Sequence, residues 1–259
     1  MTIMNAGESL ADAEQKALEI LDPELSRHGK LNMHAFNLIG DALGSLPEQN
    51  IQHAPLPQKI ATSLLVQISN DLRSSSLLAL RGYAVQAVTI VSSMFESSYC
   101  IAAIGDNQIL AQKWVNHDDP TKSFMDTKSL VTQGLRNLEH PNVEKQSKIE
   151  YRVYRQLCMA KHANPLFQME HGYIIHDGIV VAMNGPNTSE NTIRAAWFAM
   201  DHATALTFIA LISFFKFHLK PHGNDQLFGQ ILALGDARKQ LEAEAKKRWG
   251  TEDPFAGKW

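Results

Sequence analysis

Arginine and histidine residues within one helical stretch are the strongest chemical signal in this sequence. Arg155 and His162 are seven positions apart in the segment 151–165. Seven residues of α-helix leave two side chains within about 20° of one face and about 10 Å apart along the axis. A guanidinium binds phosphate through paired hydrogen bonds, and an imidazole takes up and releases protons near neutral pH. The pair therefore indicates phosphate binding and acid–base catalysis on an RNA strand.

Three neighbouring residues are candidates for binding the substrate. Gln156 adds a polar group directly beside Arg155, and Tyr151 opens the same segment. Tyr99 lies in an earlier stretch with helical spacing. In a weaker alternative, Tyr99, Tyr151 and Asp201 line a pocket for a small ligand.

The arginine–histidine spacing resembles the signature of the HEPN superfamily, in which four to six residues separate the two. That superfamily consists of helical proteins and includes many metal-independent ribonucleases. The resemblance implies a homodimer in which two protomers bring their motifs together, with Arg155 and His162 as the catalytic pair. It also implies a supporting polar residue from an earlier helix, for which Glu96 is the natural candidate.

A wider stretch, residues 85–165, resembles a family of helical bacterial and phage proteins of unknown function. That family has a helix with a glutamate, followed by a Tyr-x-x-Leu-Cys-x-x-x-His element. Here the element is Tyr154, Leu157, Cys158 and His162. The family often has an arginine a few residues before the glutamate, whereas residues 90–93 here are Ile, Val, Ser and Ser. This second resemblance implies no established activity.

The bare motif is not specific, because nine arginines and eleven histidines produce about one such match by chance. A second match, Arg27 with His34, is interrupted by Gly29. In the alternative interpretation, Glu96 and Arg155 form a structural pair. The chain is then a non-enzymatic helical interaction module, associated with phage defence or a phage-encoded system. The sequence leaves open whether the chain is an enzyme.

No other polar cluster has the spacing of a metal or cofactor site. The two neighbours Asp201 and His202 lie in the most apolar helix, where adjacent side chains point about 100° apart. We therefore expect each to be a separate core polar group. We expect no metal and no cofactor.

Composition indicates a soluble, cytoplasmic globular protein. The chain has 259 residues, of which 44% are hydrophobic and 20% charged, and its two cysteines form no C-x-x-C pair. A net charge of −3 predicts no DNA binding, and any contact with RNA requires a local basic patch. The longest uninterrupted apolar run, residues 203–215, is shorter than the roughly 20 residues of a membrane span, so we expect no membrane partner.

The periodicity predicts a mainly α fold, a multi-helix bundle with one small β-hairpin at about residues 172–183. Asp177-Gly178 between two β-type runs is the hairpin signal. A first helix should end at Asp22-Pro23, and a helix of roughly eight turns should begin after Ser189. The other expected helices cover 32–43, two helices within 58–104 that break near Arg81-Gly82, 106–117, 123–138, 143–163 and 225–249.

The loop 45–57, with three prolines, is the best domain boundary. It divides the chain into an N-terminal helical accessory segment (1–56), a main helical bundle with an inserted hairpin (57–249) and a tail (250–259). Whether the accessory segment packs on the bundle is left open.

Overall fold

Two apolar helices, α3 (Ala84–Ile104) and α8 (Glu190–Phe214), lie side by side at the centre of the molecule. Most side chains of both are buried, including Phe95, Phe198 and Phe214. The computed structural model describes residues 9–46, 53–119, 124–162, 173–176, 179–182, 185–220 and 224–249. Over these residues the chain is mainly helical, and the predicted helical bundle is confirmed.

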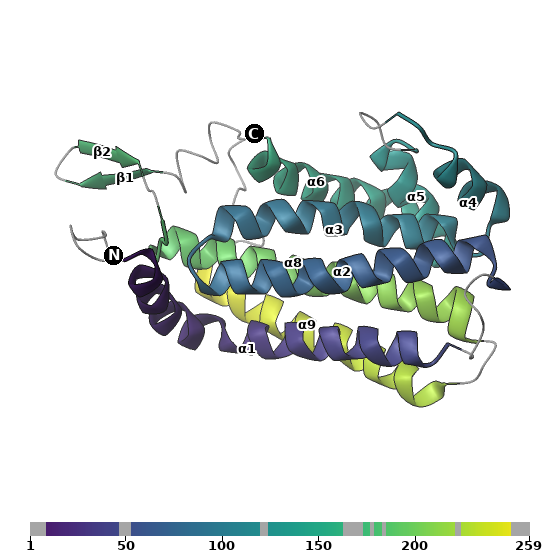
Figure 1. Cartoon of the computed structure of the whole chain (residues 1–259), viewed down its shortest axis with the longest axis horizontal. Helices are drawn as coiled ribbons and strands as arrows, with labels where there is room; N and C mark the ends of the chain where they lie inside the picture. Colours follow the sequence, from purple (N-terminus) through teal and green to yellow (C-terminus); the bar gives the residue numbers. More distant parts are fainter. Residues whose placement is uncertain are drawn as a thin grey trace.

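The remaining helices cover this central pair on two sides (Figure 1). On one side, α5 (Thr127–Asn137) and α6 (Val143–Lys161) pack against α3 and against each other. On the other side, α1 (Leu10–Gly44) and α9 (Asp225–Trp249) pack against α8. α2 (Leu56–Leu80) contacts α1, α3 and α8, and the short helix α4 (Gln108–Val115) packs on α2 and α3.

By length and composition alone, α3 and the continuous helical stretch Glu190–Leu219 are apolar enough to cross a membrane. In both, more than two thirds of the most apolar window is buried inside the bundle. Burial of this kind is typical of core helices in soluble proteins, so the two helices are weak evidence for a membrane span.

The break between α2 and α3 is fixed by Gly82. Its φ is 84°, and a Cβ atom at this position would lie 2.8 Å from the backbone nitrogen of Asn187. The Gly82 carbonyl accepts a hydrogen bond from that nitrogen at 3.1 Å. The predicted break at Arg81-Gly82 is therefore confirmed, and the glycine lets the segment before α8 approach closely.

The expected stop at Asp22-Pro23 is wrong, because α1 is one helix that contains Pro23. Proline removes one backbone hydrogen bond and usually bends a helix, and Figure 1 shows α1 changing direction in its N-terminal part. The helix continues because Leu21 and Leu25, on either side of the proline, are both fully buried. α1 contacts α2, α8 and α9, so the N-terminal segment shares one core with the bundle.

The separate helix expected at 32–43 is also wrong, because these residues form the C-terminal part of α1. The other helices begin and end close to their expected positions. Ser189 caps α8 by accepting from the Thr192 backbone nitrogen, as the sequence indicates. α8 then continues into a π-helix, η2 (Phe215–Leu219).

Strands β1 (Tyr173–His176) and β2 (Ile179–Ala182) pair antiparallel, with Tyr173 opposite Ala182 and His176 opposite Ile179. The Asp177-Gly178 turn expected from the sequence lies outside the described residues, so the turn itself stays a prediction.

Candidate functional site

Helix α6 carries most of the candidate residues, and its sides face three different environments. Asn142 caps its start by accepting from the Lys145 backbone nitrogen at 3.1 Å, and His162 follows its last residue. One side packs on α3 and α5, one lines a pocket against α8 and α9, and the third is exposed. The candidate residues are divided among these three sides.

Arg155 and His162 are both exposed. Seven residues apart on an uninterrupted helix, they lie on the same outer side of α6, as their spacing predicts. Neither forms an ion pair or side-chain hydrogen bond with the residues that the structure describes. Both are therefore accessible to a ligand on this side of the helix.

The outer side of α6 is strongly basic, which the sequence reasoning missed. We define the α6 basic face by its exposed residues Lys145, Lys148, Arg152, Arg155 and His162. Glu144 is the one exposed carboxylate of α6, and it pairs with Lys148 at 2.9 Å. The signal was present in the sequence as cations spaced three or four residues apart from Lys145 to Arg155.

Glu96 faces a different side of α6 and does not pair with Arg155, which corrects the structural pair expected from the sequence. Its carboxylate accepts a hydrogen bond from the Tyr154 hydroxyl at 2.9 Å and lies 3.8 Å from the Lys161 ammonium. Tyr154 and Lys161 are seven positions apart, so they share a side of α6 distinct from that of Arg155. Glu96 therefore links α3 to the C-terminal half of α6.

The environment around Glu96 keeps nearby groups protonated. Burial, followed by a hydrogen bond with Cys158, raises the pKa of the Tyr154 hydroxyl well above its usual range. Burial also raises the pKa of Cys100 to about 12 and that of Cys158 above its ordinary value. A neutral thiol is a poor nucleophile, so neither cysteine is poised for covalent catalysis.

The three substrate-binding candidates do not lie together. Tyr99 is fully buried beside Phe95, with a ring-centroid distance of 4.8 Å, and burial with the nearby Glu150 raises its pKa well above 10. Gln156 is buried and lines the pocket against α8 and α9. Of the three, Tyr151 alone is exposed, at the edge of the α6 basic face.

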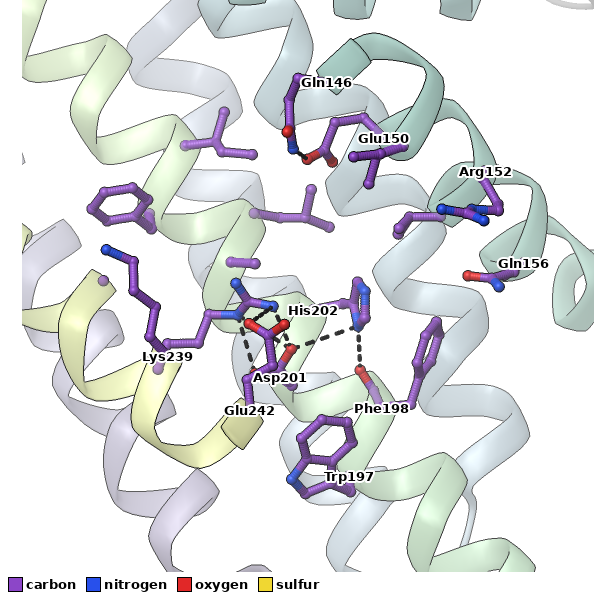
Figure 2. A pocket seen from close by; sticks show the side chains of 18 of the residues that line it. Gln146, Glu150, Arg152, Gln156, Trp197, Phe198, Asp201, His202, Lys239 and Glu242 are labelled. Atoms are coloured by element: carbon purple, nitrogen blue, oxygen red, sulfur yellow. Dashed lines mark hydrogen bonds and ion pairs between the residues drawn. The ribbon is translucent and has the colours of Figure 1, made fainter. Parts of the chain in front are cut away.

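A pocket of about 730 Å³ lies between α6, α8 and α9. Its walls combine apolar and aromatic side chains with several charged ones, among them Glu150, Asp201, His202 and Arg238. Figure 2 shows Gln146 and Glu150 projecting from α6 and His202 projecting from α8. The alternative ligand pocket expected from the sequence is corrected accordingly: Asp201 lines it, whereas Tyr99 and Tyr151 do not.

A buried ion pair forms the floor of this pocket. Asp201 is 1% exposed and accepts hydrogen bonds from Arg238 Nη2 at 2.7 Å and Nε at 3.1 Å. Glu242 Oε2 lies 3.5 Å from the same guanidinium. Because a buried carboxylate needs a charged partner, Arg238 fixes α9 against α8 at this level.

His202 lines the same pocket as Asp201, which the adjacent positions of the two residues did not predict. Its Nδ1 lies 2.9 Å from the Phe198 carbonyl and 3.9 Å from Asp201 Oδ2. Burial lowers the pKa of His202, with Asp201 acting in the opposite direction, which favours the neutral ring. Nδ1–H then donates to Phe198, and Nε2 is left as a hydrogen-bond acceptor.

Within the described part of the chain, no three His, Cys, Asp or Glu side chains gather in a way that suits a metal ion. Comparisons with protein-family models, with curated proteins and with solved structures found no match.

Proposed function

We propose that this chain is an HEPN-like protein that binds single-stranded RNA on the α6 basic face and cleaves it as a homodimer, in the cytoplasm. The observation that carries the proposal is the α6 basic face itself. Its four lysine and arginine side chains are exposed beside one exposed acidic residue, in a chain whose net charge is −3. Such a local patch attracts a phosphate backbone that the molecule as a whole does not.

The spacing along the face suits a single strand. Arg155 and His162 are about 10 Å apart along the helix axis, which is long for one phosphate group. Their side chains therefore contact successive parts of a backbone, with Arg155 holding phosphate oxygens through paired hydrogen bonds. The exposed ring of Tyr151 offers a surface on which an unpaired base stacks.

The chemistry of cleavage explains why two copies are needed. The 2′-oxygen attacks the adjacent phosphorus, and the bond from phosphorus to the 5′-oxygen breaks, which leaves a cyclic phosphate and a 5′-hydroxyl. One group must take the 2′-hydroxyl proton and another must give a proton to the leaving oxygen. Each copy supplies one His162, so two copies supply both an acid and a base.

In this proposal Glu96 is a positioning residue. Its contacts with Tyr154 and Lys161 hold the end of α6 against α3. Lys161 is the last residue of α6 and directly precedes His162.

The test is incubation of the purified chain with an unstructured single-stranded RNA. We expect wild-type protein to cleave it and the Arg155→Ala and His162→Ala variants to lose at least about a hundredfold in rate, the scale of lost acid–base or phosphate contacts. Arg73→Ala on α2 and His34→Ala on α1 remove the same residue types from exposed positions and should cleave normally. Equal cleavage by all five proteins, or by none of them, would contradict the proposal.

One observation favours a second candidate, a non-enzymatic helical interaction module associated with phage defence or a phage-encoded system. Glu96 is already engaged by Tyr154 and Lys161, an arrangement that a purely structural role explains. In this case the α6 basic face binds an acidic partner and catalyses no reaction, so the chain does not cleave RNA.

A further inference from the structure

We propose that the pocket between α6, α8 and α9 binds an organic cation, a protonated primary amine carried on an aromatic body. The amine would lie between the Glu150 carboxylate and Nε2 of His202. This site shares Arg152 with the α6 basic face but does not include Arg155 or His162, and the proposal does not depend on RNA binding.

The size and walls of the pocket suit a small aromatic molecule. Its volume of about 730 Å³ lies within the range of small-molecule sites. Trp197, Phe198 and Phe208 supply aromatic walls. At Gly235 a Cβ atom would lie 2.9 Å from the Phe208 ring, so this glycine allows the ring to pack directly against α9.

The charged side chains on the α8 and α9 walls all have ion-pair partners. On α9, Arg238 binds Asp201, and Lys239 lies 3.0 Å from Asp236. Glu242 lies near Arg238 and is 3.1 Å from Lys246. On α6, Arg152 lines the pocket and has no ion pair with a described residue, but its side chain is exposed to solvent on the α6 basic face.

Glu150 on α6 is the half-buried charged side chain of the pocket that has no ion pair within the described part of the chain. It accepts a hydrogen bond from the neutral Gln146 amide at 2.7 Å. The Arg238 guanidinium acts on it electrostatically but is hydrogen-bonded to Asp201 and forms no ion pair with it. A half-buried carboxylate with no described cation in direct contact favours a ligand that brings the positive charge.

His202 strengthens this preference. In the neutral ring, with Nδ1–H donating to the Phe198 carbonyl, Nε2 is an acceptor. Figure 2 shows Glu150 and His202 on different helices that border the pocket. Both groups are acceptors, so the ligand must donate, and a primary ammonium has three N–H groups to give. An anion would instead meet the Glu150 carboxylate.

The experiment is calorimetric titration of the full chain with three arylalkylamines, namely benzylamine, phenethylamine and tryptamine. We expect at least one to bind with a Kd of about 1 mM or tighter. Benzyl alcohol and 3-phenylpropionate, the neutral and anionic counterparts, should bind at least about tenfold more weakly.

Two variants and one control locate the site. Glu150→Gln should weaken amine binding by about tenfold or more, because it removes the charge and keeps the shape. Ala205→Leu should abolish binding by filling the pocket, since Ala205 lines it without a charge. Glu144→Gln removes a carboxylate from the outer side of α6 and should bind as the wild type does. Melting temperatures of all variants establish that each is folded.

Three results would overturn the proposal. One is that none of the amines binds with a Kd below about 10 mM. Another is that 3-phenylpropionate binds as well as the amines. The third is that Glu150→Gln binds like the wild type, which would assign the site to an apolar ligand even if Ala205→Leu blocks it.

Discussion

At the scale of single residues, the spacing of Arg155 and His162 correctly predicted that the two share one side of a helix. This is a local property of helix geometry, and it needs no knowledge of the tertiary fold. The partner of Glu96 was not predictable in the same way. Tyr154 reaches Glu96 from another helix, 58 positions away, and nothing in the local pattern distinguishes it from Arg155 next to it. The assignment of Glu96 therefore required the structure.

Replacing Tyr154 with Phe tests whether the Glu96 contact is structural. We expect the free energy of unfolding to fall by about 1 kcal/mol, because one hydrogen bond to a half-buried carboxylate is lost. That corresponds to a melting temperature lower by about 2–4 °C in a chain of this size. RNA cleavage, measured in parallel, should be retained.

Tyr151→Phe is the matched control, because Tyr151 is exposed and its hydroxyl has no hydrogen bond to a described residue. It should leave the melting temperature unchanged. Loss of cleavage in Tyr154→Phe at an unchanged melting temperature would mean that Tyr154 belongs to the chemistry and not to the scaffold.

At the scale of helices, hydrophobic periodicity and capping residues predicted most of what forms, including the break at Gly82 and the start of α8 after Ser189. The failure at Pro23 has a physical reason. Proline disfavours a helix locally, but burial of Leu21 and Leu25 against other helices outweighs that local cost. Tertiary packing of this kind is invisible in one segment of sequence.

Small residues also decide how closely helices approach. A Cβ atom at Gly134 on α5 would lie 3.0 Å from Ala102 Cβ and 3.1 Å from the Tyr99 ring on α3. Nearby, the Asn137 amide donates to the Ala102 and Ala103 carbonyls at 2.9 and 2.8 Å, which ties the end of α5 to α3.

We therefore expect Gly134→Val to destabilise the protein by about 1–3 kcal/mol, because Tyr99 is fully buried and cannot move away. Denaturant unfolding measures the change. Gly40→Val on α1 is the control, since a Cβ atom there meets nothing within 4 Å. If both variants unfold at the same denaturant concentration, the packing of α5 against α3 does not require a glycine at position 134.

At the scale of the whole molecule, the pocket between α6, α8 and α9 illustrates what a sequence cannot show. Its walls come from three segments separated along the chain, and Glu150, His202 and Arg238 become neighbours through helix packing alone. Side-chain type gave no signal for their association, and two adjacent residues, Asp201 and His202, were expected to lie apart.

Charge distribution is the whole-molecule property on which the proposed function depends. The net charge of −3 disfavours nucleic acid, so the proposal requires that binding come from the α6 basic face and not from the surface in general. Each cation that contacts a single strand contributes about 0.7 to the slope of log affinity against log salt concentration.

The most direct test is the affinity for a short single-stranded RNA, measured by fluorescence anisotropy over a range of salt concentrations. We predict that the double variant Lys145→Ala/Arg155→Ala binds more weakly than wild type and that its salt slope is smaller by about 1.4. The matched double variant Lys30→Ala/Arg73→Ala, which removes two exposed cations from α1 and α2, should bind like the wild type. If the two double variants have the same affinity and the same slope, the α6 basic face is not the RNA-binding surface.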